Sequence, residues 1–239
     1  MQSYPSYIIN NGQGSAGRNS SDALTLSETT TVNYRWEVNE NHSLNFLLGQ
    51  EAVDYQSTGF QVVTRGQASD LLTNVTSGTR ASQWADSNDS YSYLSFFFRG
   101  EYNYKDLYYG EVAARTDASS RFGKDHRWGV FWSLGFMWNI KNEAFLKDIE
   151  WLTGAQIALS TGTSGNSEIP NYDHLALVGG GANYNDEAGI YPKQSGNEEL
   201  GWEQTWSNNV GLRLGFINRI DVNIDFYHKK TTNMLMYVP

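Results

Sequence analysis

The sequence of 239 residues contains no cysteine, only 4 proline residues, and few charged residues (18%). The absence of cysteine excludes a disulfide-stabilised scaffold and a thiolate metal site. No run of about 18 apolar residues is present, which excludes a membrane-spanning helix. Basic residues are also scarce, because 17 Lys and Arg stand against 26 Asp and Glu. The resulting net charge of −9 argues against a nucleic-acid-binding protein, which needs a basic face.

Aromatic residues and glycine are abundant, with 8 Trp, 15 Tyr, 11 Phe and 23 Gly. An aromatic share of 14% is too high for a disordered chain. Apolar side chains recur at every second position, most clearly from Trp128 to Ile140, where all even-numbered residues are apolar and most odd-numbered residues are small or polar. The same alternation runs through 204–217 and 220–227. A period of 2 predicts β-strands.

We predict eight strands with two kinds of connection between them. The strands are expected at 22–38, 43–64, 90–104, 107–117, 127–140, 151–162, 203–216 and 219–235, after a loop at 1–21. Short turns at 39–42, 105–106 and 217–219, and a longer one at 141–150 with room for one helical turn, alternate with long loops at 65–89, 118–126 and 163–202. This sorting is typical of outer-membrane barrels. The prediction is therefore an all-β, antiparallel, up-and-down transmembrane β-barrel segment with short periplasmic turns and long extracellular loops.

Aromatic residues gather at both ends of the predicted strands, as the two membrane interfaces favour. Those near the short turns are Tyr34, Trp36, Tyr102, Tyr104, Tyr108, Tyr109, Trp138 and Phe216, and those toward the long loops are Trp128, Trp132, Trp202 and Trp206. The mean hydropathy of −0.53 suggests a soluble protein, but a barrel wall averages a lipid face with a wet face. Two alternatives stay open. One is a soluble carbohydrate-binding β-sandwich with an aromatic core, and the other is a complete small eight-stranded outer-membrane barrel that acts as a structural protein or adhesin.

Four ordered motifs carry a family resemblance. The first contains Arg115, Asp117, Ser119, Ser120, Arg121, Phe122 and Gly123, followed by Arg127, Trp128 and Gly129. It resembles the R-x-D-G-S-S-R-F-G … RWG signature of the SusC/RagA-like TonB-dependent outer-membrane transporters of Bacteroidota. The segments 143–147, 197–203 and 226–235 resemble further motifs of this family in the same order. Ala118, Trp132 and Asn233 depart from its usual Gly, Pro and Asp, and Ala118 puts a tight turn with positive φ in doubt.

The resemblance implies a nutrient importer in the cell outer membrane. Members have a plug domain that contacts TonB, a 22-stranded barrel in the lipid bilayer, and a SusD-like lipoprotein that caps the extracellular mouth. It implies import of a glycan or peptide with TonB energy. We expect residues 1–239 to be an interior part of such a barrel, without the plug domain and the remaining strands. On its own, such a part is expected not to transport.

No catalytic, cofactor or metal site is predicted, and we expect no enzyme activity. The four His residues are scattered without metal-ligand spacing, and no serine has a nucleophile-elbow context. Two polar loop segments could offer oxygen ligands to Ca²⁺, although a solvated loop explains them better. Their residues are Asp86, Asn88 and Asp89 in one segment and Asn183, Asn185, Asp186 and Glu187 in the other.

Two groups of candidate binding residues follow from the predicted barrel. Aromatic side chains of the long loops suit sugars, loop packing or docking of a lid protein; they are Trp84, Tyr172, Tyr184, Tyr191 and Trp202. Charged side chains on the polar strand face could line the substrate path; they are Arg99, Glu101, Glu111, Arg115 and Arg213. The alternative for the charged group is pairing within the wall or with the plug, because charges shielded from water are usually paired.

Overall fold

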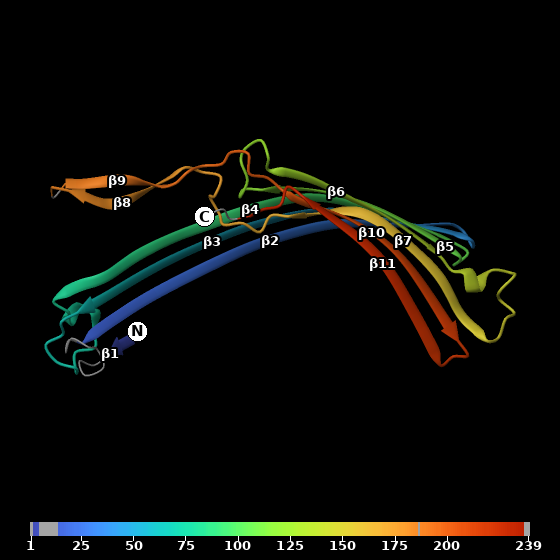
Figure 1. Ribbon diagram of the computed structural model, residues 1–239, viewed down its shortest axis with the longest axis horizontal. Coiled ribbons are helices and arrows are strands. Elements are labelled where there is room, and N and C mark those ends of the chain that lie inside the picture. Colours follow the sequence, from blue (N-terminus) through green and yellow to red (C-terminus); the bar gives the residue numbers. More distant parts are fainter. Residues whose placement is uncertain (1, 5–13, 186, 237–239) are drawn as a thin grey trace. The chain divides into compact units, whose positions relative to one another are not determined.

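The chain is all-β in a computed structural model that describes residues 2–4, 14–185 and 187–236 (Figure 1). The described strands are β1 (Gln2–Tyr4), β2 (Ser15–Asn39), β3 (His42–Arg65), β4 (Arg80–Tyr104), β5 (Tyr108–Ser119), β6 (Trp128–Trp138), β7 (Leu152–Asn166), β8 (Leu177–Tyr184), β9 (Glu187–Gln194), β10 (Glu203–Phe216) and β11 (Ile220–Thr232). Two short 3₁₀-helices, η1 (Val75–Ser77) and η2 (Ile140–Asn142), lie in connections. No helix in these residues is long and apolar enough to span a bilayer.

Nine strands form one sheet in the order β1-β2-β3-β4-β5-β6-β7-β10-β11, and β8 and β9 form a separate hairpin. Every strand pairing for which a register is defined is antiparallel. The chain divides into two units, one of residues 1–26 and 53–91 and the other of residues 27–52 and 92–239. The first unit holds β1 and the loop-side parts of β2, β3 and β4. The second unit holds the rest of these strands and β5 to β11, and it contains most of the predicted site residues.

Short connections join the strands of the second unit at one end of the sheet. Two of them have positive φ at both central residues, namely Lys105 and Asp106 (53° and 55°) and Ile217 and Asn218 (47° and 53°). This backbone matches the twist of the flanking strands in a tight hairpin. Backbone hydrogen bonds join neighbouring connections, for example from Lys105 N to Asn41 O (2.8 Å) and from Asn139 N to Leu107 O (2.7 Å). The connections therefore form a continuous rim.

Alternation gives the second unit two chemically different faces. On β6 the even-numbered side chains include Val130, Leu134 and Phe136, which are 65%, 48% and 44% exposed. We call the face that carries them the outward face. The register pairs Leu134 with Val112 of β5, so the apolar stripe continues from strand to strand. The odd-numbered side chains form the polar face, where only a few apolar side chains such as Phe131 are buried. One sheet with an uncovered apolar face differs from the two packed sheets of a sandwich.

The boundaries of the predicted strands were wrong in two places. β2 begins at Ser15 instead of 22, and β4 begins at Arg80 instead of 90. The added segments are polar on both faces, so they show no alternation, yet they pair as strands in the first unit. There, Tyr55 stacks on Tyr91 at 4.8 Å, and the Ser82 hydroxyl donates to Val63 O. Residues 1, 5–13, 186 and 237–239, which include part of the loop predicted at 1–21 and Asp186 of the second candidate calcium segment, lie outside the described residues.

The long loop predicted at 163–202 contains a hairpin that the sequence did not indicate. β8 carries three successive glycines and β9 a proline, so neither has the composition typical of a strand. The segment 141–150 does form helical turns, as expected. Ala118 lies inside β5 and has no positive φ, so the departure from glycine there is tolerated without strain.

Candidate functional site

Charged side chains of β4 and β5 meet on the polar face of the second unit. Arg99 Nη2 lies 2.9 Å from Glu111 Oε2 and also pairs with Glu101. Asn45 of β3 donates from Nδ2 to Glu101 Oε2 at 2.9 Å. Two carboxylates thus share one guanidinium and leave this cluster with an excess of negative charge. The side chains of Arg99 and Glu111 are 49% and 40% exposed, so each pair contributes only up to about 1 kcal/mol.

A second cluster surrounds Arg115, the first residue of the family motif. Its Nε donates to Asp117 Oδ1 (2.6 Å), and its Nη2 donates to Glu51 Oε2 and Ser95 Oγ (both 2.9 Å). The guanidinium also lies 5.4 Å from the centre of the Phe97 ring. Ser95 and Asp117 are buried, so this cluster is more shielded from water than the one around Arg99. Arg115 is therefore held in the wall by partners from three strands.

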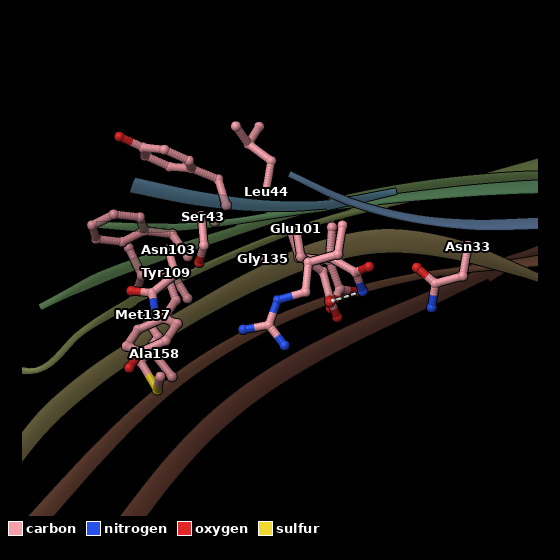
Figure 2. Close-up of a pocket in the computed structure, with 16 residues that line it drawn as sticks. Asn33, Ser43, Leu44, Glu101, Asn103, Tyr109, Gly135, Met137 and Ala158 are labelled. Carbon is pink, nitrogen blue, oxygen red and sulfur yellow. Dashed lines mark hydrogen bonds between the residues drawn. The ribbon is translucent and has the colours of Figure 1, made fainter. Parts of the chain in front are cut away.

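A pocket of about 810 Å³ lies on the wall beside the Arg99 cluster (Figure 2). Its polar lining includes Asn33, Arg35, Asn45, Glu101, Asn103, Tyr109 and Glu111. Figure 2 shows Tyr109, Met137 and Ala158 on one side of the sheet, whereas Leu44 points to the opposite side. Amides, carboxylates and a guanidinium can hydrogen-bond to a polar ligand, and Met137 adds an apolar contact. The arrangement is suited to binding polar chains, and it contains no assembled nucleophile with its base.

The structure brings together three of the five charged candidates and places a fourth in a separate cluster. Arg99, Glu101 and Glu111 form one cluster and Arg115 the other. Arg213 lies on β10, which is separated from β5 by β6 and β7, and its register neighbours are Gln156 and Asn223. Sequence reasoning missed Asn45, Glu51 and Ser95. Asn45 and Glu51 are both at odd-numbered positions of β3, and this period-2 spacing could have placed them on one face.

The five aromatic loop candidates do not form one platform. Trp84 lies in β4, in the first unit, and is 76% exposed. Tyr184 and Tyr191 lie on the β8–β9 hairpin, and Tyr184 is 86% exposed. Tyr172 has a positive φ (73°), and its carbonyl accepts from Gln194 Nε2 at 3.0 Å. Trp202 packs with Phe122 and Phe131, with ring centres 5.1 and 5.3 Å apart, so its contacts are structural.

The family motif joins two loops of the second unit. Phe122 is fully buried beside Trp202, whose Nε1 donates to Arg127 O at 2.8 Å. Gly123 N donates to Leu200 O at 3.2 Å. The other motif residues also make local contacts. The hydroxyl of Ser119 accepts a hydrogen bond from Arg121 N, and that of Ser120 accepts one from Ser92 N. Arg121 Nε donates to Asn171 Oδ1. Gly129 lies close to the rings of Phe131 and Trp202, while Trp128 is exposed.

No cluster of three or more His, Asp or Glu side chains that could hold a metal ion occurs in the part of the chain that the structure describes. Asp86, Asn88 and Asp89 lie within β4, and Asn183 and Asn185 lie at the tip of the β8–β9 hairpin. Calcium binding by these segments stays a prediction.

Comparison with known proteins gives consistent matches over nearly the whole chain. The profile of the family described as TonB dependent receptor-like, beta-barrel, matches residues 2–239. The TonB-dependent receptor SusC of Bacteroides thetaiotaomicron is 32% identical over 95% of the chain, and the TonB-dependent receptor P39 of Formosa agariphila is 28% identical over 97%. A solved structure of the RagAB peptide transporter superposes with a TM-score of 0.91, at 34% identity over 97% of the chain.

The matched proteins are much longer. The chain spans 22% of P39, 23% of SusC and 26% of the matched chain of the RagAB structure.

Proposed function

The chain belongs to the TonB-dependent receptor-like β-barrel family, and from this membership we propose that it forms part of the wall of an outer-membrane nutrient importer driven by TonB. The observation that carries this proposal is the contrast between the two sheet faces. The outward face presents Val130, Leu134 and Phe136 with no protein cover among the described residues, which suits lipid. The opposite face presents hydrogen-bonding groups around a pocket, which suits a wet lumen.

The proposed substrate is a polar oligomer, either a peptide or a glycan. The similarity to the RagAB peptide transporter supports a peptide, because part of that protein resembles nearly the whole of this chain. Exposed aromatic side chains such as Trp84 and Tyr184 support a glycan, since aromatic rings stack well on sugar faces. A SusD-like lipoprotein and TonB are the proposed partners, in line with the family resemblance and with the relatives named TonB-dependent receptors.

Arg99, Glu101 and Glu111 are the residues we propose to line the substrate path in this wall. They border the pocket or contact residues that border it, and about half of the Arg99 side chain is open to solvent. Arg115 serves mainly to hold the wall together, because three strands supply its partners. Arg213 is exposed on the same face and could meet substrate independently of the other four.

The test measures uptake by the full-length protein in its own host. The gene is deleted, and uptake of labelled oligopeptides and oligosaccharides is compared with that of the parent strain and of a strain without TonB. We expect both deletions to abolish uptake of the same substrate class. In the complemented strain, Arg99→Gln with Glu111→Gln should lower uptake severalfold at unchanged surface expression. Arg219→Gln, in a turn outside the pocket, is the matched control and should have no effect.

Normal uptake of both substrate classes after gene deletion would overturn the proposal. If deletion impaired only attachment of cells to surfaces, the alternative of a structural barrel or adhesin would take its place. Equal uptake in the Arg99/Glu111 and Arg219 variants would remove the pocket from the substrate path while leaving the importer itself standing.

A further inference from the structure

The connection between β6 and β7 folds toward the outward face of the sheet. Glu143 Oε1 accepts hydrogen bonds from Tyr108 Oη (2.6 Å) and from Trp138 Nε1 (3.1 Å). Tyr108 pairs with Trp138 across β5 and β6, and both rings belong to the even-numbered outward stripe, where Tyr108 also stacks near Phe136. A residue of the turn that reaches these two side chains must lie at the outward edge of the rim.

Several backbone groups of this connection are hydrogen-bonded within it. Lys141 Nζ donates to the carbonyl oxygens of Leu146 (2.9 Å), Lys147 (3.0 Å) and Ile149 (2.8 Å). An ammonium group has three donors, so this lysine is saturated. Backbone bonds from Leu146 N and Lys147 N to Glu143 O close the turn further. Each backbone group bonded in this way lowers the cost of placing the turn against an apolar medium.

Apolar side chains of the connection and its neighbours remain uncovered. Phe145 is 65% exposed although it lies between two residues that make the internal contacts. Trp151, which immediately precedes β7, stacks on Phe216 at 6.0 Å with the rings nearly parallel, and more than half of Trp151 is exposed. Ile217 in the adjoining hairpin turn is also exposed, and its N–H donates to Trp151 O at 2.9 Å. The exposed apolar groups thus continue the outward stripe past the strand ends.

We propose that residues 139–151 form an interfacial anchor that inserts Phe145 into the phospholipid leaflet at the short-turn end of the wall. Glu143 is the positioning residue, because its two hydrogen bonds hold the turn against the aromatic groups of the outward face. The occupant is a lipid leaflet because the anchor is continuous with the apolar stripe of β5 and β6, and aromatic side chains favour the boundary between headgroups and acyl chains. Asn142 and Asp148, both exposed and polar, stay on the watery side. This inference rests on the proposed function, in which the outward face meets lipid.

Depth measurements on the full-length protein test the anchor. The present chain has no cysteine, so after replacement of any cysteine elsewhere a single nitroxide label can be placed at Phe145→Cys, Asn142→Cys or Val130→Cys. The protein is reconstituted in nanodiscs of phosphatidylethanolamine and phosphatidylglycerol, and collisions with oxygen and with a water-soluble nickel chelate are compared. We expect the oxygen-to-nickel ratio to be highest at 130, severalfold above the aqueous value at 145, and lowest at 142.

The three labels separate failure of the anchor from failure of the proposed function. A lipid reading at 130 with equal aqueous readings at 145 and 142 would overturn the anchor alone. An aqueous reading at 130 would overturn the lipid-facing wall and the anchor with it. A label at 145 shielded from both reagents would point to a protein cover and would also overturn the anchor.

The role of Glu143 has its own test in the Phe145→Cys background. Glu143→Ala removes both hydrogen bonds and should shift the label toward the aqueous reading, whereas Glu143→Gln keeps an acceptor oxygen and should retain most of the depth. An unchanged depth reading in the alanine variant would show that Glu143 does not position the anchor.

Discussion

Gly123 illustrates, at the scale of a single residue, why the family motif contains the residue types that it does. A Cβ atom at this position would lie 1.9 Å from the carbonyl oxygen of Glu198, closer than two non-bonded atoms can approach. The preceding Phe122 is fully buried, and Gly123 N is bonded to Leu200 O. The glycine therefore allows two loops, distant in sequence, to lie in backbone contact. Its role is packing, because neither loop could shift without exposing Phe122.

Gly123→Ala should destabilise the protein because the loop of Glu198 must move to admit the new methyl group. We expect a loss of about 1–3 kcal/mol in the free energy of unfolding, in the range of other overpacked sites. Urea unfolding of the full-length protein in phospholipid vesicles, followed by tryptophan fluorescence, measures the loss. Gly110→Ala is the matched control, because a Cβ atom there meets nothing within 4 Å. Equal stability of the two variants would contradict the packing role.

Period-2 alternation located the charged residues but could not identify their partners. It placed Arg99, Glu101 and Glu111 on one face correctly, since side-chain direction in a strand depends only on parity. Glu51 lies 64 positions from Arg115, and their contact depends on how β3 lies against the strands that follow it. That register is set by turn geometry and packing, which a single sequence does not encode locally. The same limit hid the partners of Trp202, a loop aromatic for which sugar binding, loop packing and docking of a lid protein were all left open; it packs with Phe122 and Phe131.

At the scale of the secondary-structure element, the hairpin turns differ in how well their residues suit the backbone. Asn218 accepts its positive φ readily, because asparagine tolerates the left-handed region. Ile217 does not, since a β-branched side chain at φ 47° is crowded by its own backbone. An exposed isoleucine kept in a strained conformation suits the proposed lipid contact at this rim better than it suits the turn. The β10–β11 hairpin is thus less stable than it would be with a residue at 217 that tolerates positive φ.

Ile217→Asn should stabilise the β10–β11 hairpin by relieving this crowding. A left-handed conformation costs an ordinary residue about 1–2 kcal/mol, so a gain of about 1 kcal/mol is expected. The measurement is the same urea titration, with Lys105→Asn as the control. Lys105 has a similar φ of 53° but no branch at Cβ, and its gain should be smaller. A lower free energy of unfolding in Ile217→Asn than in the unchanged protein would mean that apolar contacts of Ile217 outweigh the strain.

Strand existence was predictable, whereas strand length was not. The segments of β4, β5 and β6 in the second unit alternate strongly because one of their faces is apolar. The loop-side part of β4 from Arg80 to Asp89 is rich in Ser, Asn and Asp, so its two faces look alike in the sequence. It becomes a strand through pairing in the first unit, a tertiary effect that overrides local propensity. The β8–β9 hairpin was missed because its three glycines and its proline are atypical of strands.

At the scale of the whole molecule, the composition wrongly suggests a soluble protein. In the described residues the buried apolar side chains are few, with Phe122, Phe131 and Leu152 as the large ones, whereas many large apolar side chains are exposed. A soluble domain of this size would bury most of them in one core. Here the exposed apolar groups of β5 and β6, among them Val112, Val130 and Leu134, share one face of the sheet, and the charged pairs share the other. The negative mean hydropathy is the average of these two faces.

Adjacent residues of β10 allow the two faces to be compared directly. Val210 and Asn209 are both exposed and point to opposite sides, since Val210 pairs with Leu159 and Phe226 while Asn209 pairs with Ser160 and Tyr227. If the outward face meets lipid, Val210→Arg should cost about 2–4 kcal/mol, the value for arginine near the middle of a bilayer. Asn209→Arg places the same charge toward the wet face and should change stability by less than about 0.5 kcal/mol. Unfolding of both full-length variants in phospholipid vesicles measures the difference. Because the two substitutions add the same side chain one position apart, equal costs would mean that lipid does not cover the apolar face.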